Sequence, residues 1–576
     1  MARADRDGPP SVTLEQVATS ARPSRAAFLR LATLAIAALF AFVVLVQGIS
    51  APFQKDAEPQ SAEWIQSIVR DGHWLIPHDA YGYTDRKPPL FYWLSAIVAK
   101  STGGTVDEVR ARAVSVVAGT ALAVSVLAWT IANVGATEGW LAFLFMLGTY
   151  GFASRATEAL TDMLLTLLLF AAYSAIYPIL DSPTPDLPRR KIFVGVMLGL
   201  GILTKGPVAI VLCALAVSMF LLIERRNPIA LLRNRWPWQV VAIAIAIGAV
   251  WYVPAALVGG HKIVRIIFAE NFGHFMPAKL GGTGESYRPF YYIAARLLGG
   301  AFPMTLLILP AAIAFYTGEI SPEKRRPVIY QISMSLAVLM FFSIASVKRD
   351  DYILPALPGI AILCASVFTL DFRALASKLR DVVVAIYVVG PIFVFASFLL
   401  FPSHTTHLNL QSSDAAYLST LRLHAKTMIQ MVVLTTVMWL LALVTAAVAI
   451  FRGRAIVTGT ALGVFAVAGS LFLTAGLRPG LAVERSIKSF VPTIVDHVRA
   501  DQLCIPAGIN YELSYYYGAA VPDISNPRCN YLIATPRELD AMTPDYRARL
   551  KPIAKSDLIG GGGPPALFEI SPKAAK

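Results

Sequence analysis

The 576-residue chain has few charged residues, few cysteines and no periodic glycine or proline, and each shortage excludes a class of protein. Only 15% of the residues are charged and 56% are hydrophobic, whereas soluble domains have about 25% charged residues, so an ordinary soluble enzyme is excluded. The 39 glycines and 37 prolines are scattered among long apolar runs, which excludes a collagen-like or disordered chain. Four cysteines are too few for a disulfide scaffold and form no Cys-x-x-Cys metal signature. The remaining class is a polytopic α-helical membrane protein.

Apolar runs near the roughly 20 residues needed to cross a bilayer recur along the chain. We place about thirteen spans at residues 28–48, 112–133, 137–154, 161–180, 193–204, 206–222, 237–257, 293–316, 328–346, 353–371, 382–402, 426–450 and 456–476. The first run is too long for a typical signal-peptide core, so we expect a retained helix. The division between 193–204 and 206–222 falls at Lys205-Gly206-Pro207.

The distribution of charge orients these spans. The net charge of +14 does not by itself indicate nucleic acid as a partner, because membrane proteins concentrate Lys and Arg in cytoplasmic loops. Basic clusters occupy residues 22–30, 189–191, 225–235, 324–326, 373–380 and 452–454, all on one side of the expected topology. We therefore expect a cytoplasmic N-terminal tail (1–27), a transmembrane catalytic domain (28–476) with an external loop at 50–111, and an external C-terminal domain (477–576).

The C-terminal segment differs in composition from the rest of the chain. It is more polar and contains short apolar runs at 531–534 and 566–570, which favour a small α/β domain. Cys504 and Cys529 lie in this segment, and an oxidising compartment would allow them to pair. Whether they form a disulfide or two thiols is left open by the sequence.

Acidic and basic residues gather at helix ends and loops on the expected external face. The group comprises Asp56, Glu58, Glu63, Lys87, Arg155, Glu158, Asp162, Lys205, Glu270, Asn271, Lys348, Arg349, Asp350, Asp351 and Tyr352. Polar groups at membrane depth are costly and mark functional sites, so their convergence predicts a site there.

Single members of this group also have structural explanations. Lys87 stands where a lysine can extend its ammonium group to the lipid headgroups, and Asp162 stands where it can cap the N-terminus of a helix. Residues 348–351 suit a solvated turn with internal ion pairs. Lys205 has the weakest structural explanation, because a turn there requires glycine and proline but no charge.

These residues stand in motifs that resemble a known family. The motifs are Lys87-Pro88-Pro89-Leu90 followed by Tyr92-Trp93, Thr161-Asp162-Met163, Leu203-Thr204-Lys205-Gly206-Pro207, Glu270-Asn271-Phe272 and Tyr352-Ile353-Leu354-Pro355. With the carboxylates after the first span, they are similar to the aminoarabinose (4-amino-4-deoxy-L-arabinose) lipid A transferase branch of the bacterial protein O-mannosyltransferase-like C-type glycosyltransferases. The resemblance is strongest over residues 51–370 and implies about thirteen transmembrane helices with a small α/β periplasmic C-terminal domain.

The resemblance also implies an activity. It is the inverting transfer of a sugar from a polyprenyl (undecaprenyl) phosphate donor to lipid A phosphate at the periplasmic face of the inner membrane, a lipopolysaccharide modification linked to polymyxin resistance. Another acceptor, such as a glycan, another lipid or a protein hydroxyl, stays open. A secondary transporter or flippase is less favoured, because transporters place ionisable groups near the midplane in repeated halves, whereas here they stand at external helix ends.

The chemistry of such a transfer assigns roles to the candidate residues. Negative charge develops on the departing phosphate, so cations are expected to bind it: Lys87, Lys205, and Lys348 or Arg349. The predicted catalytic carboxylates, which act as base and orienter or bind the sugar's ammonium, are Asp56 or Glu58 together with Asp162. Further site candidates are Glu158, Glu270, Asn271 and Tyr352.

Two departures from the family pattern affect this assignment. The family usually has adjacent Asp-Glu in the first loop, whereas Ala57 separates Asp56 from Glu58 here, so either acid can fill the key position. Arg86 stands where relatives often carry Glu, which weakens any zinc site inferred from them. The external histidines, which are His73, His78, His261 and His274, have no diagnostic zinc spacing. We therefore expect no required cofactor and assign no metal ligands, and a structural zinc ion stays an alternative that the sequence does not support.

Overall fold

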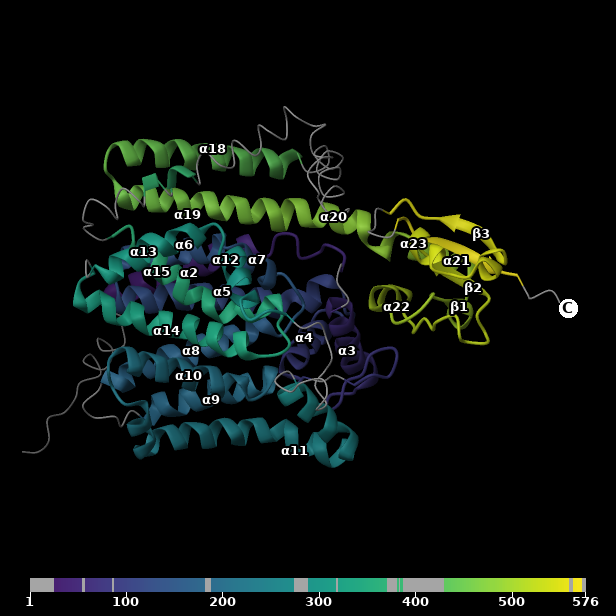
Figure 1. The fold of residues 1–576 in the computed structure, drawn as a ribbon, viewed down its shortest axis with the longest axis horizontal. Coiled ribbons are helices and arrows are strands. Elements are labelled where there is room, and N and C mark those ends of the chain that lie inside the picture. The colour runs from purple at the N-terminus through teal and green to yellow at the C-terminus, as the bar shows by residue number, and fades with distance from the viewer. Residues whose placement is uncertain are drawn as a thin grey trace, which may run out of the picture.

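The computed structural model describes residues 25–53, 57–84, 87–181, 188–273, 288–317, 320–369, 381–382, 384–386, 429–558 and 563–571. Figure 1 shows long helices lying side by side in a bundle, with a small domain of strands and short helices at one end. The polytopic helical class and the small C-terminal α/β domain expected from the sequence are both confirmed.

Seven helical segments in the described residues are long and apolar enough to cross a membrane. They comprise α2 (Arg25–Leu45), α5 (Glu108–Asn133), α8 (Asp162–Asp181), α11 (Arg235–Phe272), α14 (Pro322–Ile344), α18 (Ile429–Phe451), and α19 (Ala455–Leu471) with its continuation. An eighth crossing results if α12 (Tyr292–Gly300) and the segment Met304–Ala314, which includes part of α13 (Ile308–Tyr316), count as one span bent by 108°. Shorter helices complete the bundle: α6 (Ala136–Gly148), α7 (Tyr150–Ala156), α9 (Pro188–Lys205), α10 (Val208–Ile223) and α15 (Leu357–Ser366).

The predicted spans correspond to these helices with local differences. The predicted break between 193–204 and 206–222 is confirmed, since α9 ends at Lys205 and α10 begins at Val208. The predicted run 137–154 is divided into α6 and α7, because Thr149 between them has an extended backbone (φ −78°, ψ 123°). The predicted run 353–371 begins in a 3₁₀ turn, Asp350–Ala356, before α15. The run 382–402 lies almost wholly outside the described residues, so the total of thirteen stays a prediction.

Close contacts between large and small side chains hold the bundle together. The Tyr173 ring on α8 stacks on Tyr330 of α14 with centroids 4.0 Å apart, and each hydroxyl donates a hydrogen bond of 2.6 Å to the other residue's carbonyl oxygen. These reciprocal bonds satisfy polar groups that would otherwise be costly in an apolar environment. Where α9 packs against α11, a Cβ added at Gly199 would lie 2.7 Å from Ile247 Cβ, so a small residue is required for the close approach.

Two helices of the expected external loop lie at the end of the bundle that carries the small domain (Figure 1). They are α3 (Ala57–Asp71) and α4 (Leu90–Ser101). Glu58 in the first turn of α3 and Arg70 in its last turn match the helix dipole. Helix α3 packs against both α4 and α22 of the small domain, so this loop connects the bundle to the C-terminal residues.

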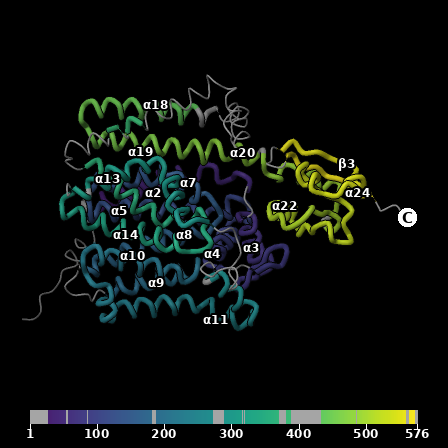
Figure 2. The backbone as a smooth tube through the Cα atoms, in the orientation of Figure 1, coloured from purple at the N-terminus to yellow at the C-terminus, as the bar shows by residue number. Residues whose placement is uncertain are grey.

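The chain enters the small domain through a continuous helical connection. Helix α19 continues through a π-helical turn, Phe472–Leu477, into α20 (Arg478–Arg485), and Figure 2 follows this path from the bundle into the domain. The domain contains a sheet in the order β1-β2-β4-β3, with β1 and β2 parallel and the other pairs antiparallel. The strands are β1 (Leu503–Cys504), β2 (Tyr531–Ala534), β3 (Leu550–Lys555) and β4 (Ala566–Ile570). Short helices flank the sheet: α21 (Val491–His497), α22 (Tyr511–Tyr517), α23 (Pro536–Asp540) and α24 (Pro544–Arg547), with 3₁₀ turns at Ile487–Ser489 and Ala500–Gln502.

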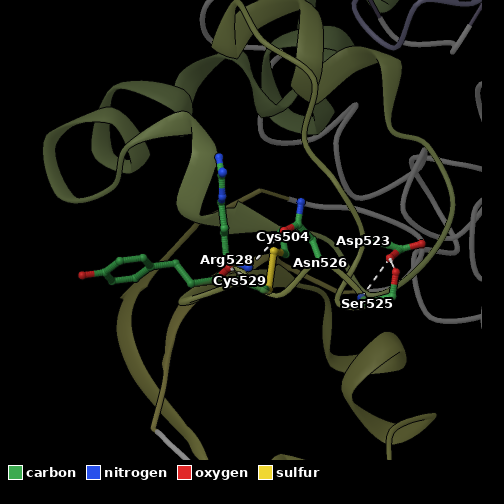
Figure 3. Close-up of a disulfide and its surroundings, with 7 residues drawn as sticks. Cys504, Asp523, Ser525, Asn526, Arg528 and Cys529 are labelled. Atoms are coloured by element: carbon green, nitrogen blue, oxygen red, sulfur yellow. Dashed lines mark hydrogen bonds between the residues drawn. A yellow bond between two sulfur atoms is a disulfide. The ribbon is translucent and has the colours of Figure 1, made fainter.

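A disulfide joins β1 to the loop before β2. Cys504 and Cys529 are bonded, with their Cα atoms 5.7 Å apart, and Figure 3 shows this bond beside the turn that precedes Cys529. The turn is shaped by side chains: Asp523 accepts from the Ser525 N–H at 2.9 Å, and Asn526 accepts from the Arg528 N–H at 3.0 Å. The pairing that the sequence left open is therefore present, and it ties this loop to the sheet.

Candidate functional site

A cavity of ≈ 330 Å³ lies where the ends of several helices meet. It is bounded by the start of α8, the end of α9, the start of α10, the ends of α11 and α14, the 3₁₀ turn before α15, and the residues preceding α4. Most of its walls are apolar: Leu165, Pro207, Val208, Val211, Leu212, Phe341, Phe342, Ala345 and Pro355. Its charged lining residues are Lys87, Asp162, Lys205, Glu270, Arg349 and Asp351. The site therefore suits a molecule with both an apolar part and a charged group.

Lys205 reaches the cavity because the helix breaks directly after it. Gly206 has a φ of +84°, a left-handed conformation that favours glycine, and Pro207 then precedes α10. The Gly206 N–H still donates to Ile202 O at 2.9 Å, so the last turn of α9 stays closed. A Cβ at Gly206 would lie only 2.1 Å from Asn271 Oδ1, so glycine is also required for space. This turn places Lys205 at the end of α9 and brings α11 against it.

Two carboxylates surround the ammonium group of Lys205. Its Nζ donates a hydrogen bond to Asp162, the first residue of α8, and lies 3.6 Å from Asp351 Oδ2. Nζ also lies 5.0 Å from the centre of the Tyr352 ring. The Asp162 and Asp351 side chains are only 6% and 9% exposed. Pairing with opposite charges allows these side chains to stay ionised although they are buried. The structure also brings together the predicted residues Asp162, Lys205 and Tyr352.

The other predicted cations separate into two groups. Lys87 and Arg349 line the cavity, and Arg349 Nε lies 3.6 Å from Asp351 Oδ1. Lys348 is not among the described residues that line it; its Nζ donates to the carbonyl oxygens of Arg288 at 3.1 Å and Ala345 at 2.5 Å. Of the two alternatives at 348–349, the geometry favours Arg349, and phosphate binding by either residue stays a prediction.

Glu270 and Asn271 enter the cavity wall from the end of α11. The Asn271 amide nitrogen donates to Ile267 O at 2.8 Å, which directs its oxygen toward Gly206. Asn271 therefore fixes α11 against the turn that carries Lys205. Glu270 adds a third carboxylate to the lining of the described cavity.

Glu58 lies in a different place from the one expected of a catalytic acid at this cavity. It is fully buried and is held by the Arg112 guanidinium at 2.8 and 3.0 Å, with the Ala159 N–H at 2.9 Å. Arg478 Nη2 lies 3.4 Å from the same carboxylate. Glu58 is therefore a junction between α3, α5 and the turn before α8, and it is not among the described residues lining the cavity. Asp56 lies outside the described residues, and the catalytic role of either acid stays a prediction.

Glu158 lies between two arginines in the turn that precedes Asp162. Arg155 donates a hydrogen bond to Glu158, and Arg478 Nη2 lies 3.6 Å from its other oxygen. The Glu158 side chain is 3% exposed. It is not among the described residues that line the cavity, and it stands four residues before Asp162, which does line it.

Sequence reasoning did not assign roles to three residues of this region. Asp351 was visible in the charged group at 348–352, but its pairing with Lys205 spans 146 positions of the chain. Arg112 stands at the start of an apolar span, and a charge at such a depth is a usable signal. Arg478 follows the last predicted span and shows no local sign that it contacts Glu58 and Glu158.

The histidines do not form a recognisable metal centre in the described residues. His73 and His78 have ring centres 4.3 Å apart, and His73 Nδ1 shares a hydrogen bond of 3.0 Å with Ser67 Oγ. No group of three or more His, Cys, Asp or Glu side chains suited to a metal ion is found within the part of the chain that the structure describes. His274 lies outside it. The expectation that no metal is required stays a prediction.

A buried acid joins α3 to the small domain. Glu63 accepts hydrogen bonds from Ser514 Oγ of α22 and from the Ala80 N–H at 3.1 Å, and its side chain is 4% exposed. Burial, with the nearby charge of Asp79, raises the pKa of Glu63 to about 7, although both hydrogen bonds act in the opposite direction. Its ionisation therefore changes near neutral pH, at the contact between the two parts of the molecule.

The fold defines the class of this protein: a polytopic helical membrane protein with the fold of ArnT. Two solved structures of ArnT from Cupriavidus metallidurans superpose over most of the chain. The one bound to undecaprenyl phosphate gives a TM-score of 0.70 at 17% identity, covering 94% of this chain and 97% of that one. The apo structure gives 0.71 at 17% identity.

Within that class, the sequence is similar to aminoarabinose transferases, as the motifs predicted. Residues 86–253 match the model of the dolichyl-phosphate-mannose-protein mannosyltransferase family. Two curated relatives are named undecaprenyl phosphate-alpha-4-amino-4-deoxy-L-arabinose arabinosyl transferase. The one from Shewanella sediminis is 26% identical over 57% of this chain and 58% of its own length, and the one from an Enterobacter species is 29% identical over 54% of each. The chain thus matches less than two thirds of the length of these relatives.

Proposed function

We propose that this protein transfers 4-amino-4-deoxy-L-arabinose from an undecaprenyl phosphate donor to a phosphate of lipid A, at the periplasmic face of the bacterial inner membrane. The observation that carries the proposal is the position of Lys205 and its carboxylates among apolar cavity walls. The names of the curated relatives and the undecaprenyl phosphate in the ArnT structure support this choice of donor.

The cavity matches the two halves of such a donor. Val208, Val211 and Phe341 belong to its apolar wall, against which the first isoprene units can lie while the rest of the tail stays in the bilayer. The phosphate then meets Lys205, with Lys87 and Arg349 as further cations. Preorganised cations stabilise charge that develops in a transition state more than they stabilise the ground state.

The transfer forms a bond between an acceptor phosphate oxygen and the anomeric carbon. The bond from that carbon to the donor phosphate oxygen breaks, and the electron pair leaves with undecaprenyl phosphate. Attack from the face opposite the leaving group inverts the configuration. An anionic acceptor needs no general base, because it has no proton to lose. Asp162, Asp351 and Glu270 can therefore bind the ammonium group of the sugar and stabilise the positive charge that develops at the anomeric carbon.

Lys205 must exchange partners during this cycle. In the described structure its ammonium group is held by Asp162 and lies close to Asp351. A donor phosphate that binds Lys205 competes with these carboxylates, which are then released toward the ammonium of the sugar. The exchange leaves each of these charges with a partner of opposite sign in a buried site, where an unpaired charge is costly.

The proposed orientation places the cavity and the small domain in the periplasm. The basic clusters at 189–191, 225–235 and 324–326 are expected in the cytoplasm. In agreement with this, Lys324 and Arg326 form ion pairs with Glu138 and Glu224, away from the helix ends that build the cavity. The Cys504–Cys529 disulfide also suits an oxidising compartment.

The test is a transfer assay with purified protein in lipid vesicles, using isotope-labelled undecaprenyl phosphate aminoarabinose and lipid A. Mass spectrometry should find the label on lipid A. Lys205→Gln should lose transfer. Lys324→Gln is the control and should keep near wild-type transfer, because that lysine also pairs with a carboxylate but lies away from the cavity. A panel with other lipids, glycans and peptide hydroxyls identifies the acceptor. Label that stays on the carrier with every acceptor would overturn the proposal, and label that only crosses the bilayer would favour a flippase.

A further inference from the structure

A chain of alternating charges links α5 to the residues before α8 and includes the first residue of α20, in the C-terminal segment. Its members, in order of contact, are Arg112, Glu58, Arg478, Glu158 and Arg155. The separations are 2.8 Å for Arg112–Glu58, 3.4 Å for Glu58–Arg478 and 3.6 Å for Arg478–Glu158, and Arg155 is hydrogen-bonded to Glu158. The charges of Asp162 and Asp351 act on Arg155 in turn. The printed contacts of the chain end at Arg155, which stands seven residues before Asp162.

Arg478 is the central member of this chain and its only described contribution from the C-terminal segment. It is the first residue of α20, directly after the π-helical turn that ends the last membrane helix. Besides the two carboxylates, its Nη1 donates to Thr157 Oγ1 at 2.8 Å and to Ser154 O at 3.3 Å. One guanidinium thus contacts α3, the last turn of α7 and the α7–α8 turn (residues 157–161) at once.

The α7–α8 turn determines where Asp162 lies. Thr157 and Glu158 stand five and four residues before Asp162, and the N–H of the next residue, Ala159, donates to Glu58 at 2.9 Å. Both carboxylates bound by Arg478 therefore hold the segment that leads into α8. A displacement of this segment moves Asp162 relative to Lys205.

The same region supports the small domain on the bundle. Lys488 Nζ lies 2.6 Å from Glu108 Oε1, and the Tyr516 hydroxyl donates to the same oxygen at 2.7 Å. The Phe53 N–H donates to the Tyr516 hydroxyl at 2.8 Å, and the Phe53 ring lies 4.9 Å from the Arg112 guanidinium. The contacts that attach the small domain to the bundle thus adjoin the charge chain at Arg112.

We propose that Arg478 is a positioning residue for the transfer reaction. It holds the α7–α8 turn so that Asp162 meets Lys205, and it couples the attachment of the C-terminal domain to the cavity. The inference rests on the proposed function. It assigns to the C-terminal segment a part in the geometry of the site, although the cavity lining in the described residues ends at Pro355.

The fork of the guanidinium is essential to this role. Nη1 binds Thr157 and Ser154 while Nη2 faces Glu58 and Glu158. A lysine offers one ammonium on a flexible stem and cannot reproduce this planar arrangement. Arg478→Lys therefore keeps the charge but loses the geometry, and it separates positioning from charge neutralisation.

The experiment compares Arg478→Lys and Arg478→Gln with Arg326→Lys, which alters a matched arginine whose guanidinium binds Glu224 at 2.5 and 3.1 Å away from the cavity. Each full-length protein is assayed in vesicles for kcat and donor KM. The affinity and stoichiometry of undecaprenyl phosphate binding are measured on the same samples. We expect kcat of Arg478→Lys to fall about 100-fold, as for a displacement of about 1 Å in a reacting group, with unchanged binding stoichiometry. Arg326→Lys should retain wild-type kcat.

A double variant adds an independent readout. If Arg478 acts through Glu158, adding Glu158→Gln to Arg478→Gln should lower kcat much less than Glu158→Gln does in the wild-type background. Equal factors in both backgrounds would overturn the inference. So would wild-type kcat in Arg478→Lys, or a loss of binding stoichiometry that accounts for the whole loss of kcat. A wild-type protein without transfer would overturn the proposed function and this inference with it, whereas an active wild type with unaffected Arg478 variants overturns only the inference.

Discussion

Lys205 donates a hydrogen bond from its ammonium group to the carboxylate of Asp162, across 43 positions of the sequence. The pair joins the last residue of α9 to the first residue of α8 and lies at the charged end of a mostly apolar cavity. Helices α8 and α9 also pack against each other. The site therefore depends on where two helices end as well as on which residues they carry.

Removal of Lys205 should affect stability and transfer separately. Lys205→Met leaves Asp162 and Asp351 buried without the cation between them, which we expect to lower the free energy of unfolding by about 3–5 kcal/mol. Transfer should fall about 100- to 1,000-fold, the usual effect of removing one stabilising group. Adding Asp162→Asn should recover part of the stability and none of the transfer. Thermal unfolding and the vesicle assay measure the two effects, and recovery of transfer in the double variant would contradict the proposed role of Lys205.

The turn after Lys205 should not tolerate a side chain. Gly206→Ala places a Cβ 2.1 Å from Asn271 Oδ1 at a φ of +84°, and the left-handed backbone alone costs about 1–2 kcal/mol. Asn271→Ala should relieve the contact but not the backbone cost, so the double variant should recover only in part. Gly299→Ala is the control, because a Cβ there meets nothing within 4 Å. Equal unfolding midpoints for the two glycine variants would show that the turn is more adaptable than the structure indicates.

The contact between α3 and α22 should weaken as the pH rises toward neutrality. Because the pKa of Glu63 is raised from 4.5 to about 7, the folded protein holds a proton that the unfolded chain has lost between these values. The stabilising contribution is complete below pH 4.5 and is lost as the pH rises through 7, by at most about 3 kcal/mol.

Glu63→Gln keeps the neutral form and should remove this dependence. The measurement is the midpoint of thermal unfolding from pH 5 to pH 8 for both proteins, compared as the difference between the two at each pH. The variant should gain stability relative to the wild type as the pH rises. Parallel curves would mean that Glu63 is ionised in the folded protein throughout this range.

The disulfide should stabilise the small domain specifically. Cys504 and Cys529 are 25 residues apart, and removing a bridge over a loop of this length costs about 3 kcal/mol in the chain-entropy description. We expect Cys504→Ser/Cys529→Ser to lower the unfolding midpoint of the C-terminal domain in differential scanning measurements. Reductant should produce the same shift in the wild type and none in the variant, and a reductant effect on the variant would point to another target.

Transfer should continue after metal removal. Incubation with a strong chelator followed by exchange into metal-free buffer should leave kcat within about twofold of the untreated protein, because stabilisation of the leaving phosphate is assigned to side-chain cations. Metal analysis of the same sample provides the control. A loss of activity restored by zinc alone would show that a metal ion takes part and would direct attention to the external histidines.

The local elements of this site could be predicted from the sequence, whereas its long-range pairs could not. The break at Gly206-Pro207 was visible because glycine and proline interrupt an apolar run, and the structure places Lys205 there as expected. The partner Asp351 lies 146 positions away, and no periodicity in the chain predicts that contact.

Glu58 shows how a correct location can leave the role of a residue undetermined. The sequence placed this acid after the first span near other external charges. The structure buries it against Arg112, 54 positions away, and Arg478, 420 positions away. Burial of a carboxylate between arginines is a three-dimensional property, so the sequence alone could not distinguish a junction of helices from an acid at the cavity.

The apolar walls beside the charged end of the cavity have a consequence for enzymology. A donor whose tail remains in the bilayer reaches Lys205 by lateral diffusion, so the variable that governs saturation is its mole fraction among lipids. Adding detergent or inert lipid at a fixed amount of donor should therefore raise the apparent KM in proportion to the dilution, even though the bulk concentration of the donor is unchanged. Kinetic constants for this protein are comparable between laboratories only when they are expressed per unit of membrane surface.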